Sequence, residues 1–437
     1  MSAPVRSISA VPPRRGVCPG LSQPLPTGDG LLVRILPAGT IALDAFAALC
    51  AAARAHGNGI IEVTARGSIQ VRGLSTHSAP RFADAIAARD IAADDGVPLV
   101  CNPLAGLDAE IFDAPAFAAA LRRALTPQSI ALCLDPKVSV VIDSGGALNV
   151  ARVAADIRVR AEVFDGETVL RLAVGGDEAN AFDLGVIAAE DGVEAVSRLL
   201  LILAERGVRA RDIIATRGTA CFAGALPCAR RSAVRRDHGV STGRPGRDTI
   251  GLHPLRDGSF ASGIALAFGH AETVALEKLV EAAVTAGARG LRTAPDRSLL
   301  AIGVTRERAA RFFTAATQLG FVTRADDPRR LVIACAGAPL CASAHIAARS
   351  IAPGLAAAAV PYLRDGSTLH ISGCAKGCAH PRAAALTVVG KPGDCDLVAN
   401  GSARDAAFAA APVQELGAVI TAYLRDHDPA AEGNSHV

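Results

Sequence analysis

The chain has 437 residues, 50% of them hydrophobic, which is enough to bury a substantial core and predicts a globular protein of about three domains or sub-domains. Its net charge of +3 comes from nearly balanced totals, 45 Lys and Arg against 42 Asp and Glu, so the composition does not favour a protein that binds nucleic acid or an anionic membrane. The absence of Trp and the presence of only two Tyr leave few aromatic rings on which bases could stack.

The first predicted element is an N-terminal arm over residues 1–28, which is rich in Pro and Arg and has no apolar period. Arg and Pro stand where a secretory signal needs an apolar run, and no stretch of the chain reaches the about 20 apolar residues of a membrane helix. These features predict a cytoplasmic protein. The odd number of cysteines, 11, then favours metal ligation or buried thiols over disulfides.

An internal repeat follows the arm. Residues 31–74 align without gaps with residues 261–304, an offset of 230. The most informative matches are glycines that punctuate the elements: Gly39 with Gly269, Gly57 with Gly287 and Gly73 with Gly303. The segment is therefore predicted to be duplicated.

Each copy is predicted to be half of a split α/β module, over residues 29–78 and 251–308. In the first copy a strand, LLVRIL, precedes a helix with apolar residues at helical spacing, LDAFAALCAAARAHG, and two short strands follow, IIEV and IQVRG. Neither half is large enough to bury its helix face alone. We therefore expect the two halves to pair about a pseudo-twofold axis and to leave a shared groove between them.

Two larger α/β units are predicted to face this groove. The first covers residues 79–250 and ends in a linker, RRSAVRRDHGVSTGRPGRD, whose charge run is typical of a solvated segment, with phosphate binding as the alternative. The second covers 309–425, and a polar tail over 426–437 is predicted to be disordered. The predicted fold class is α+β, with duplicated half-modules and two larger α/β domains.

Four cysteines in the second α/β unit form two pairs, each directly after a predicted strand. Cys335 and Cys341 form a C-x5-C pair in LVIACAGAPLCASAH, and Cys374 and Cys378 form a C-x3-C pair in TLHISGCAKGCAHP. A cubane cluster needs four thiolates from short turns, with small residues that let backbone N–H groups approach the sulfurs. The pattern favours a 4Fe-4S cluster. The alternatives are structural zinc, whose usual pairs are C-x2-4-C, and four buried thiols.

The remaining cysteines form no second convincing set; they are Cys18, Cys50, Cys101, Cys133, Cys221, Cys228 and Cys395. Cys50 lies on the apolar face of the predicted helix and Cys133 in a predicted strand, so both are predicted to pack in the core. Cys221 and Cys228 are close in sequence and could bind metal, but packing is the favoured interpretation.

The order of the two cysteine pairs and the duplicated half-modules resemble the sulfite/nitrite reductase superfamily, over about residues 16–425. The segment VTARGSIQV is similar to the turn segment of the sirohaem reductases at Thr64, Arg66 and Gln70. NPLAGLD and LDPKVS resemble two further segments of that superfamily, with Lys137 at its first lysine.

Three departures separate the chain from the sirohaem reductases. Gly67 replaces a Gln, Ser139 stands where a second lysine is usual, and PLVCNP offers no Arg ahead of NPLAGLD. Reduction of a small oxyanion needs a dense set of cationic donors, of which only part remains. By contrast RRGVCPGLSQPLPTGDGLLVR, HPLRDG and above all SGCAKGCAHP resemble the precorrin-3B synthases. The resemblance favours that family, with a sirohaem-dependent assimilatory sulfite or nitrite reductase as the alternative.

The resemblance to precorrin-3B synthases implies an oxidoreductase of the monooxygenase type in cobalamin (vitamin B12) biosynthesis. It implies O2-dependent hydroxylation of precorrin-3A at C20 with γ-lactone formation, electrons derived from NADH, a 4Fe-4S cluster and a mononuclear non-haem iron, without sirohaem. It also implies a nitrite/sulfite reductase-like fold with ferredoxin-like half-modules. No G-x-G-x-x-G lies between a predicted strand and helix, so we expect the electrons to come from a separate reductase.

Sirohaem and precorrin-3A are both tetrapyrroles fringed by carboxylates, so the resemblance implies that the substrate occupies the place of sirohaem in the groove. Arg side chains bind carboxylates bidentately. The expected substrate-binding residues are Arg66, Arg72, Lys137, Arg292, Arg297 and Lys376, and for each the alternative is an exposed charge on a turn or strand edge.

An iron that activates O2 takes imidazole and carboxylate ligands and keeps open positions. His380, which follows the cluster motif, is the expected ligand, and His253, Asp108 and Asp143 are further candidates; for a lone His, a hydrogen-bonded structural role is the alternative. Cys378, at the bridging cysteine of the superfamily, is expected nearest to the second metal or the substrate. An electron-transfer or cluster-carrier protein would need neither this length nor a duplicated groove.

Overall fold

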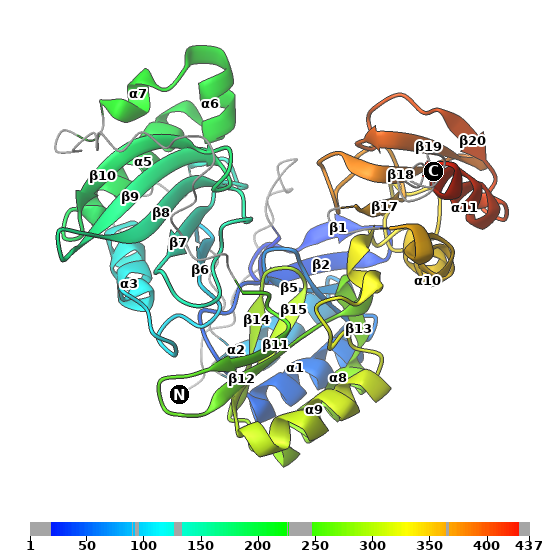
Figure 1. Cartoon of the computed structure of the whole chain (residues 1–437), viewed down its shortest axis with the longest axis horizontal. Coiled ribbons are helices and arrows are strands. Elements are labelled where there is room, and N and C mark those ends of the chain that lie inside the picture. The colour runs from blue at the N-terminus through cyan, green and yellow to red at the C-terminus, as the bar shows by residue number, and fades with distance from the viewer. Residues whose placement is uncertain are drawn as a thin grey trace, which may run out of the picture.

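The computed structural model describes residues 19–89, 91, 96–125, 133–224, 226, 247–363 and 367–427. Most of the predicted arm, linker and tail therefore lie outside the described residues, as do Cys18 and Cys228. The two half-modules form a base, and the two α/β units stand on either side above it (Figure 1). None of the described helices is long and apolar enough to cross a membrane.

The predicted repeat is present element by element. The first half-module contains β2 (Gly30–Ile35), α1 (Leu43–His56), β4 (Ile60–Val63) and β5 (Ile69–Leu74). The matching elements of the second are β12 (Phe260–Ala265), α8 (Thr273–Thr285), β14 (Gly290–Ala294) and β15 (Ser298–Val304). Two further helices, α2 (Ser78–Ala87) and α9 (Arg306–Gln318), extend the repeat beyond the residues that align in sequence.

One short strand of each half-module pairs with the sheet of the other half-module. From the first half, β3 (Ile41–Ala42) pairs with β14, and from the second, β13 (His270–Glu272) pairs with β4. The two sheets have the orders β1-β2-β5-β4-β13 and β11-β12-β15-β14-β3. At the edge opposite the exchanged strand lies β1 (Leu25–Thr27) in the first sheet and β11 (Gly251–Pro254) in the second. The reciprocal exchange gives the two halves the expected pseudo-twofold arrangement and joins them into one unit.

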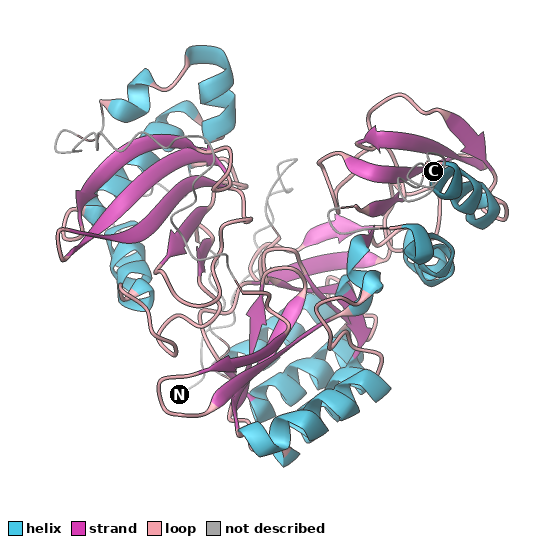
Figure 2. Cartoon of the chain, in the orientation of Figure 1, coloured by secondary structure: helices cyan, strands magenta, loops and turns pink. Residues whose placement is uncertain are grey.

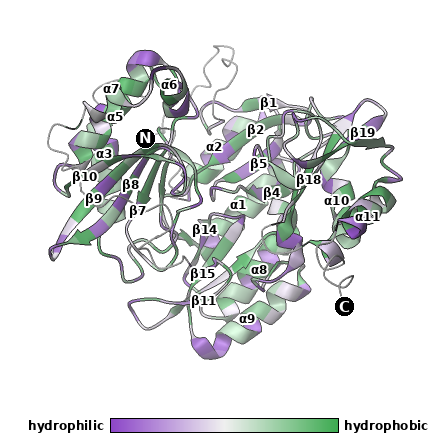
Figure 3. Cartoon of the chain, turned by 45° about the horizontal axis from the view of Figure 1, so that its top comes forward, coloured by the Kyte–Doolittle hydropathy of each residue, from purple (hydrophilic) through white to green (hydrophobic). Residues whose placement is uncertain are grey.

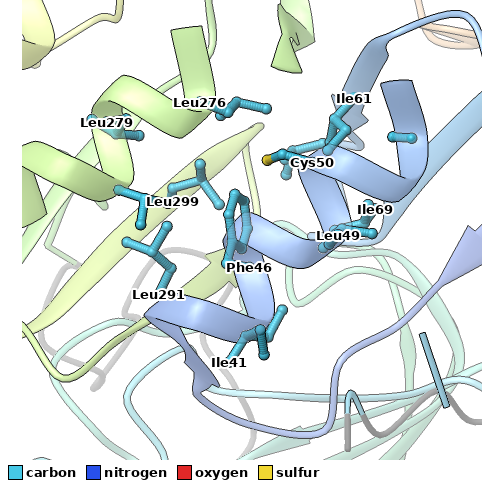
Figure 4. Packing of buried hydrophobic residues seen from close by; sticks show 14 of the residues in the cluster. Ile41, Phe46, Leu49, Cys50, Ile61, Ile69, Leu276, Leu279, Leu291 and Leu299 are labelled. Carbon is cyan, nitrogen blue, oxygen red and sulfur yellow. The ribbon is translucent and has the colours of Figure 1, made fainter. Parts of the chain in front are cut away.

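One hydrophobic core lies between the half-modules (Figure 4). Apolar residues of α1 recur three and four positions apart, as at Phe46, Leu49 and Cys50, and all three are buried. They face Leu276 and Leu279 of α8, which are also fully buried. Helices α1, α8 and α9 lie together on one side of the sheets (Figure 2), and the outward start of α9 is hydrophilic (Figure 3). The buried position predicted for Cys50 is confirmed.

The two α/β units share one strand order, which the sequence comparison of the half-modules did not reveal. The sheets run β10-β9-β8-β7-β6 and β16-β17-β18-β19-β20. In chain order, the first two strand pairs of each sheet are parallel and the last two are antiparallel. The strands are β6 (Leu99–Cys101), β7 (Val140–Asp143), β8 (Ala155–Phe164), β9 (Glu167–Gly176), β10 (Phe182–Ala188), β16 (Val332–Ala334), β17 (Leu369–Ser372), β18 (Ala384–Lys391), β19 (Asp394–Gly401) and β20 (Ala409–Ala411). Thus β6 and β7 correspond to β16 and β17.

The remaining helices of the described residues lie mostly in these two units. They are α3 (Ala114–Leu125), α5 (Gly192–Arg206), α6 (Ala210–Arg217) and α7 (Ala220–Ala223) in the first unit, α10 (Ala348–Ala359) and α11 (Leu416–Asp426) in the second, and the short helices η2 (Ala267–Gly269), η3 (Pro328–Leu331) and η4 (Val360–Tyr362). The core position predicted for Cys133 is wrong. Its side chain is exposed, because the adjacent Leu134 takes the buried place.

Candidate functional site

Two loops that leave the same edge of one sheet carry the four clustered cysteines. Strands β16 and β17 are parallel neighbours, with Ala334 opposite Ile371. Cys335 directly follows β16, and Cys374 follows β17 after a single glycine. The carboxyl ends of parallel strands are where α/β sheets bind ligands, so the topology brings the two predicted pairs together.

Backbone hydrogen bonds interlock the two loops. The N–H of Gly373 donates to Cys335 Sγ at 3.1 Å, and the N–H of Cys335 donates to Ile371 O at 3.1 Å. The N–H of His345 donates to Gly373 O at 2.8 Å. A Cβ at position 373 would lie 3.3 Å from Cys335 Sγ and 2.7 Å from the Cβ of Ala344, so a glycine is needed for this close approach.

The four thiols share one electrostatic neighbourhood. Burial raises the pKa of the Cys335 thiol, N–H donors oppose that rise, and the nearby Cys341 and Cys374 add to it. Burial also raises the pKa of Cys378, as do Cys374 and Cys341. The Cys335 and Cys378 thiols are thus harder to ionise because other thiols are close, and a bound metal would favour their thiolate forms.

This donor set fits a cubane cluster. Within the described residues no group of three or more His, Cys, Asp or Glu side chains could hold a single metal ion. A cubane has a different requirement, because its cysteines are spread over the corners of the cluster. Four thiols, small residues in both loops and an N–H donor aimed at a sulfur meet that requirement.

A lysine of the first α/β unit lies close enough to the cysteines to affect the pKa of one of them. Lys137, on the loop before β7, acts with Lys376 to oppose the raised pKa of Cys378. Arg66 Nη1 donates to Ser139 Oγ at 3.4 Å, which links the first half-module to the same loop. Lys376 Nζ donates to Ser343 Oγ at 2.7 Å, so it also ties the two cysteine loops together. The structure therefore brings three of the expected substrate-binding residues to one region.

Arg297 occupies an unusual position beside the second cysteine loop. Its backbone is left-handed, with φ of 63°, and its side chain runs along Gly269, where a Cβ would lie 2.7 Å from Arg297 Cδ. Burial lowers the pKa of its guanidinium. The side chain has no hydrogen-bond or ion-pair partner in the part of the chain that the structure describes, and its charge acts on His370 and His380.

Arg72 and Arg292, by contrast, already bind main-chain carbonyls. Arg72 Nη1 donates to Leu340 O at 3.1 Å. Arg292 Nη1 donates to Pro103 O at 3.2 Å and to Ala105 O at 2.9 Å. These two arginines therefore support the loop that carries Cys341 and the loop after β6.

The four candidate iron ligands do not meet at one point. His380 Nε2 lies 3.3 Å from Ala383 O in the second cysteine loop. Asp108, in a loop, and Asp143, at the end of β7, belong to the first α/β unit, where Asp143 Oδ1 accepts from Asn102 and Asp108 Oδ2 accepts from Ala147 N–H. His253 is buried on β11, with its Nε2 3.1 Å from Thr249 O. The ligand role of His380 stays a prediction.

Two features of the site were missed in the sequence. His370 on β17 is fully buried, and neither ring nitrogen has a partner among the described residues; burial, then His380 and Arg297, lower its pKa to about 4. A His inside an apolar strand next to the cysteine motif was a usable signal. Arg382 Nη2 donates to Asp177 Oδ2 at 2.6 Å and joins the two α/β units, a contact that no sequence pattern indicated.

Comparisons with known proteins agree with this architecture. The model of the nitrite/sulfite reductase ferredoxin-like half domain matches residues 23–89. The solved structure of the Mycobacterium tuberculosis NirA protein has a TM-score of 0.73 and 18% identity, and the match covers 91% of this chain and 80% of that one. The predicted α+β fold with duplicated ferredoxin-like half-modules is thereby confirmed.

Two relatives bear on the choice between the two families that the sequence resembles. The precorrin-3B synthase of a Sinorhizobium species is 40% identical over 396 residues, which cover 90% of this chain and 84% of that protein. The sulfite reductase [NADPH] hemoprotein beta-component of Xanthomonas campestris pv. campestris strain B100 is 32% identical over 123 residues, only 26% of this chain and 22% of that protein. The first likeness extends over nearly the whole chain and the second over a segment.

Proposed function

Because the chain belongs to the precorrin-3B synthase family, we propose that it catalyses the O2-dependent hydroxylation of precorrin-3A at C20, with closure of a γ-lactone, in cobalamin biosynthesis. The observation that carries the proposal is the 40% identity over 90% of the chain. In this reaction one oxygen atom enters the substrate and the other leaves as water, so two electrons are consumed. We propose that they derive from NADH through a separate reductase.

Cys335, Cys341, Cys374 and Cys378 would hold the 4Fe-4S cluster. When bound, such a cluster supplies electrons one at a time to the neighbouring site. The backbone N–H of Gly373, aimed at Cys335 Sγ, offsets part of the negative charge that the thiolates bring into the protein. A mononuclear non-haem iron, with His380 as one ligand, belongs to the proposal on the family resemblance alone.

The substrate would lie in the groove, with its carboxylates on the basic side chains there. Arg66, Lys137, Lys376 and Arg297 are the proposed contacts. Two observations support this choice: the Lys137 amine and the Arg297 guanidinium have no hydrogen-bond or ion-pair partner within the described residues. The carbonyl contacts of Arg72 and Arg292 favour a supporting role for both, in which they shape the loops that line the groove.

Replacement of Lys137 by methionine is expected to raise the dissociation constant for the tetrapyrrole by about 10- to 150-fold. The reason is the loss of one charge-assisted hydrogen bond, worth about 1.5–3 kcal/mol. Binding would be followed by the change in the tetrapyrrole absorption spectrum during anaerobic titration. The matched control is Lys278→Met on the exposed face of α8, which should leave the affinity unchanged. Equal affinities in all three proteins would remove Lys137 from the proposed contacts.

The function is tested on protein purified anaerobically. Iron, sulfide and zinc are measured, ultraviolet-visible and reduced EPR spectra are recorded, and precorrin-3A is then supplied with O2, NADH and a reductase. Cluster signals, no sirohaem bands and a product heavier by one oxygen atom, labelled from 18O2, are the expected results. If the protein shows sirohaem bands and reduces sulfite or nitrite, it is a sirohaem-dependent reductase and the proposal is wrong. Zinc without sulfide would overturn it.

A further inference from the structure

A largely buried carboxylate of the first half-module contacts two arginines that connect it to the first cysteine loop. Glu62 on β4 has a side-chain exposure of only 14%, and its Oε1 accepts from Arg72 Nε at 3.0 Å and from Arg349 Nη2 at 2.5 Å. Gln70, with its amide turned to suit both neighbours, donates to Glu62 Oε2 at 3.0 Å. Burial raises the pKa of this carboxyl, but Arg349 and Arg72 outweigh the effect and hold it below its usual value.

Both arginines connect this carboxylate to the cysteine loop. Arg72 donates to Leu340 O, the carbonyl next to Cys341. Arg349 stands in the first turn of α10, the helix into which the same loop leads. The loop is thus held at its middle and at its end by two guanidinium groups that share one anchor.

A third contact with the first cysteine loop comes from the turn between β1 and β2. A Cβ at Gly28 would lie 2.6 Å from Ala342 N and 2.6 Å from Pro339 O, so the turn packs directly on the backbone around Cys341. Asp29, next in the chain, lies 3.8 Å from Arg72 Nη1. The first half-module therefore contacts the cysteine loop through backbone packing and through a network of charges.

The position that matches Glu62 in the second half-module also carries a side chain that supports a loop of an α/β unit. The residue 230 positions after Glu62 is Arg292, on the matching strand β14. Arg292 binds the carbonyls of Pro103 and Ala105, in the loop after β6 that corresponds to the loop after β16. The loop after β6, which has no cysteines, is contacted from this position by Arg292 itself. At the matching position, Glu62 instead holds two arginines that connect it to the loop that carries Cys335 and Cys341.

We propose that Glu62 is a positioning residue that fixes the Cys341 loop and sets the reduction potential of the cluster through the charge balance of Arg72 and Arg349. The inference rests on the proposed cluster. Buried ion pairs add little net stability but are costly to break, so a network of this kind is better suited to fixing one geometry than to holding the fold together. A cluster gains negative charge on reduction, and uncompensated guanidinium groups nearby favour the reduced state.

The test uses two substitutions of opposite charge effect in the full-length, cluster-loaded protein. Glu62→Gln removes the negative charge that the two guanidinium groups share, and is expected to shift the reduction equilibrium about tenfold toward the reduced cluster, or about +59 mV for one electron. Arg349→Met removes a positive charge and is expected to shift it about tenfold the other way. The midpoint is measured by EPR-monitored redox titration, and loss of iron to a chelator reports how firmly the loop is held.

The matched control is Glu162→Gln in the first α/β unit. Glu162 is also a strand carboxylate between two arginines, 2.9 Å from Arg171 and 3.8 Å from Arg160. This substitution should leave the midpoint of the redox titration unchanged. Shifts of the same sign in Glu62→Gln and Arg349→Met, or shifts equal to that of the control, would overturn the proposal. A wild-type protein without iron and sulfide would instead overturn the cluster itself, so the two failures are distinguishable.

Discussion

A chain in which serine replaces Cys341 is expected to lose its iron and sulfide and more than about 100-fold of its turnover of precorrin-3A. Outer-shell changes at metal sites typically cost 10–100-fold, and removal of a ligand costs more. Cys341 is the cysteine closest to the Arg72 contact at Leu340, and its thiol adds to the raised pKa of both Cys335 and Cys378. It is therefore close to a cysteine of each pair. Iron and sulfide analysis together with the EPR spectrum of the reduced protein measure the loss.

The control for this experiment is Cys133→Ser. Cys133 is exposed in the first α/β unit and belongs to neither cysteine loop. Its replacement should leave iron, sulfide and turnover at wild-type values. A Cys341→Ser protein that keeps a full complement of iron and sulfide would show that the cluster has other ligands, and the assignment of all four cysteines would fall with it.

The elements of the half-modules could be predicted because their signals are local. Strand β4 has the bounds of the predicted segment IIEV, and α1 follows from apolar residues at helical spacing around Phe46 and Leu49. The exchange of β3 and β13 could not be predicted. Strands of two and three residues are too short to show an alternating pattern, and their pairing depends on how the two halves pack.

The candidate site was predictable to the extent that it lies within motifs. Cys374 and Cys378 are separated by three residues, and the strand before them is read from its apolar residues. The partner of Glu62 was not predictable, because Arg349 lies 287 positions away. Contacts of that kind arise from the placement of one domain on another, on which local sequence patterns carry no information.

The second large effect is expected in the core between the half-modules, where replacement of Phe46 by alanine should lower the free energy of unfolding by about 3–5 kcal/mol. Phe46 is 1% exposed and lies among Leu49 of its own helix and Leu291 and Leu299 of the other half-module (Figure 4). The cavity would therefore open between the halves, where neither sheet can collapse alone because β3 and β13 tie both together. Urea denaturation followed by circular dichroism measures the change.

The control is Phe164→Ala, at an exposed position 51% accessible on β8, which should change the free energy of unfolding by less than about 0.5 kcal/mol. If the half-modules form one folding unit, Phe46→Ala lowers the midpoint of a single transition and iron is released in that same transition, because Gly28 and Arg72 of the first half hold the Cys341 loop. Two separate transitions, with iron retained through the first, would show that the second α/β unit keeps its cysteine loops in place without the half-modules. Such a result would contradict the coupling that the shared core and the exchanged strands predict.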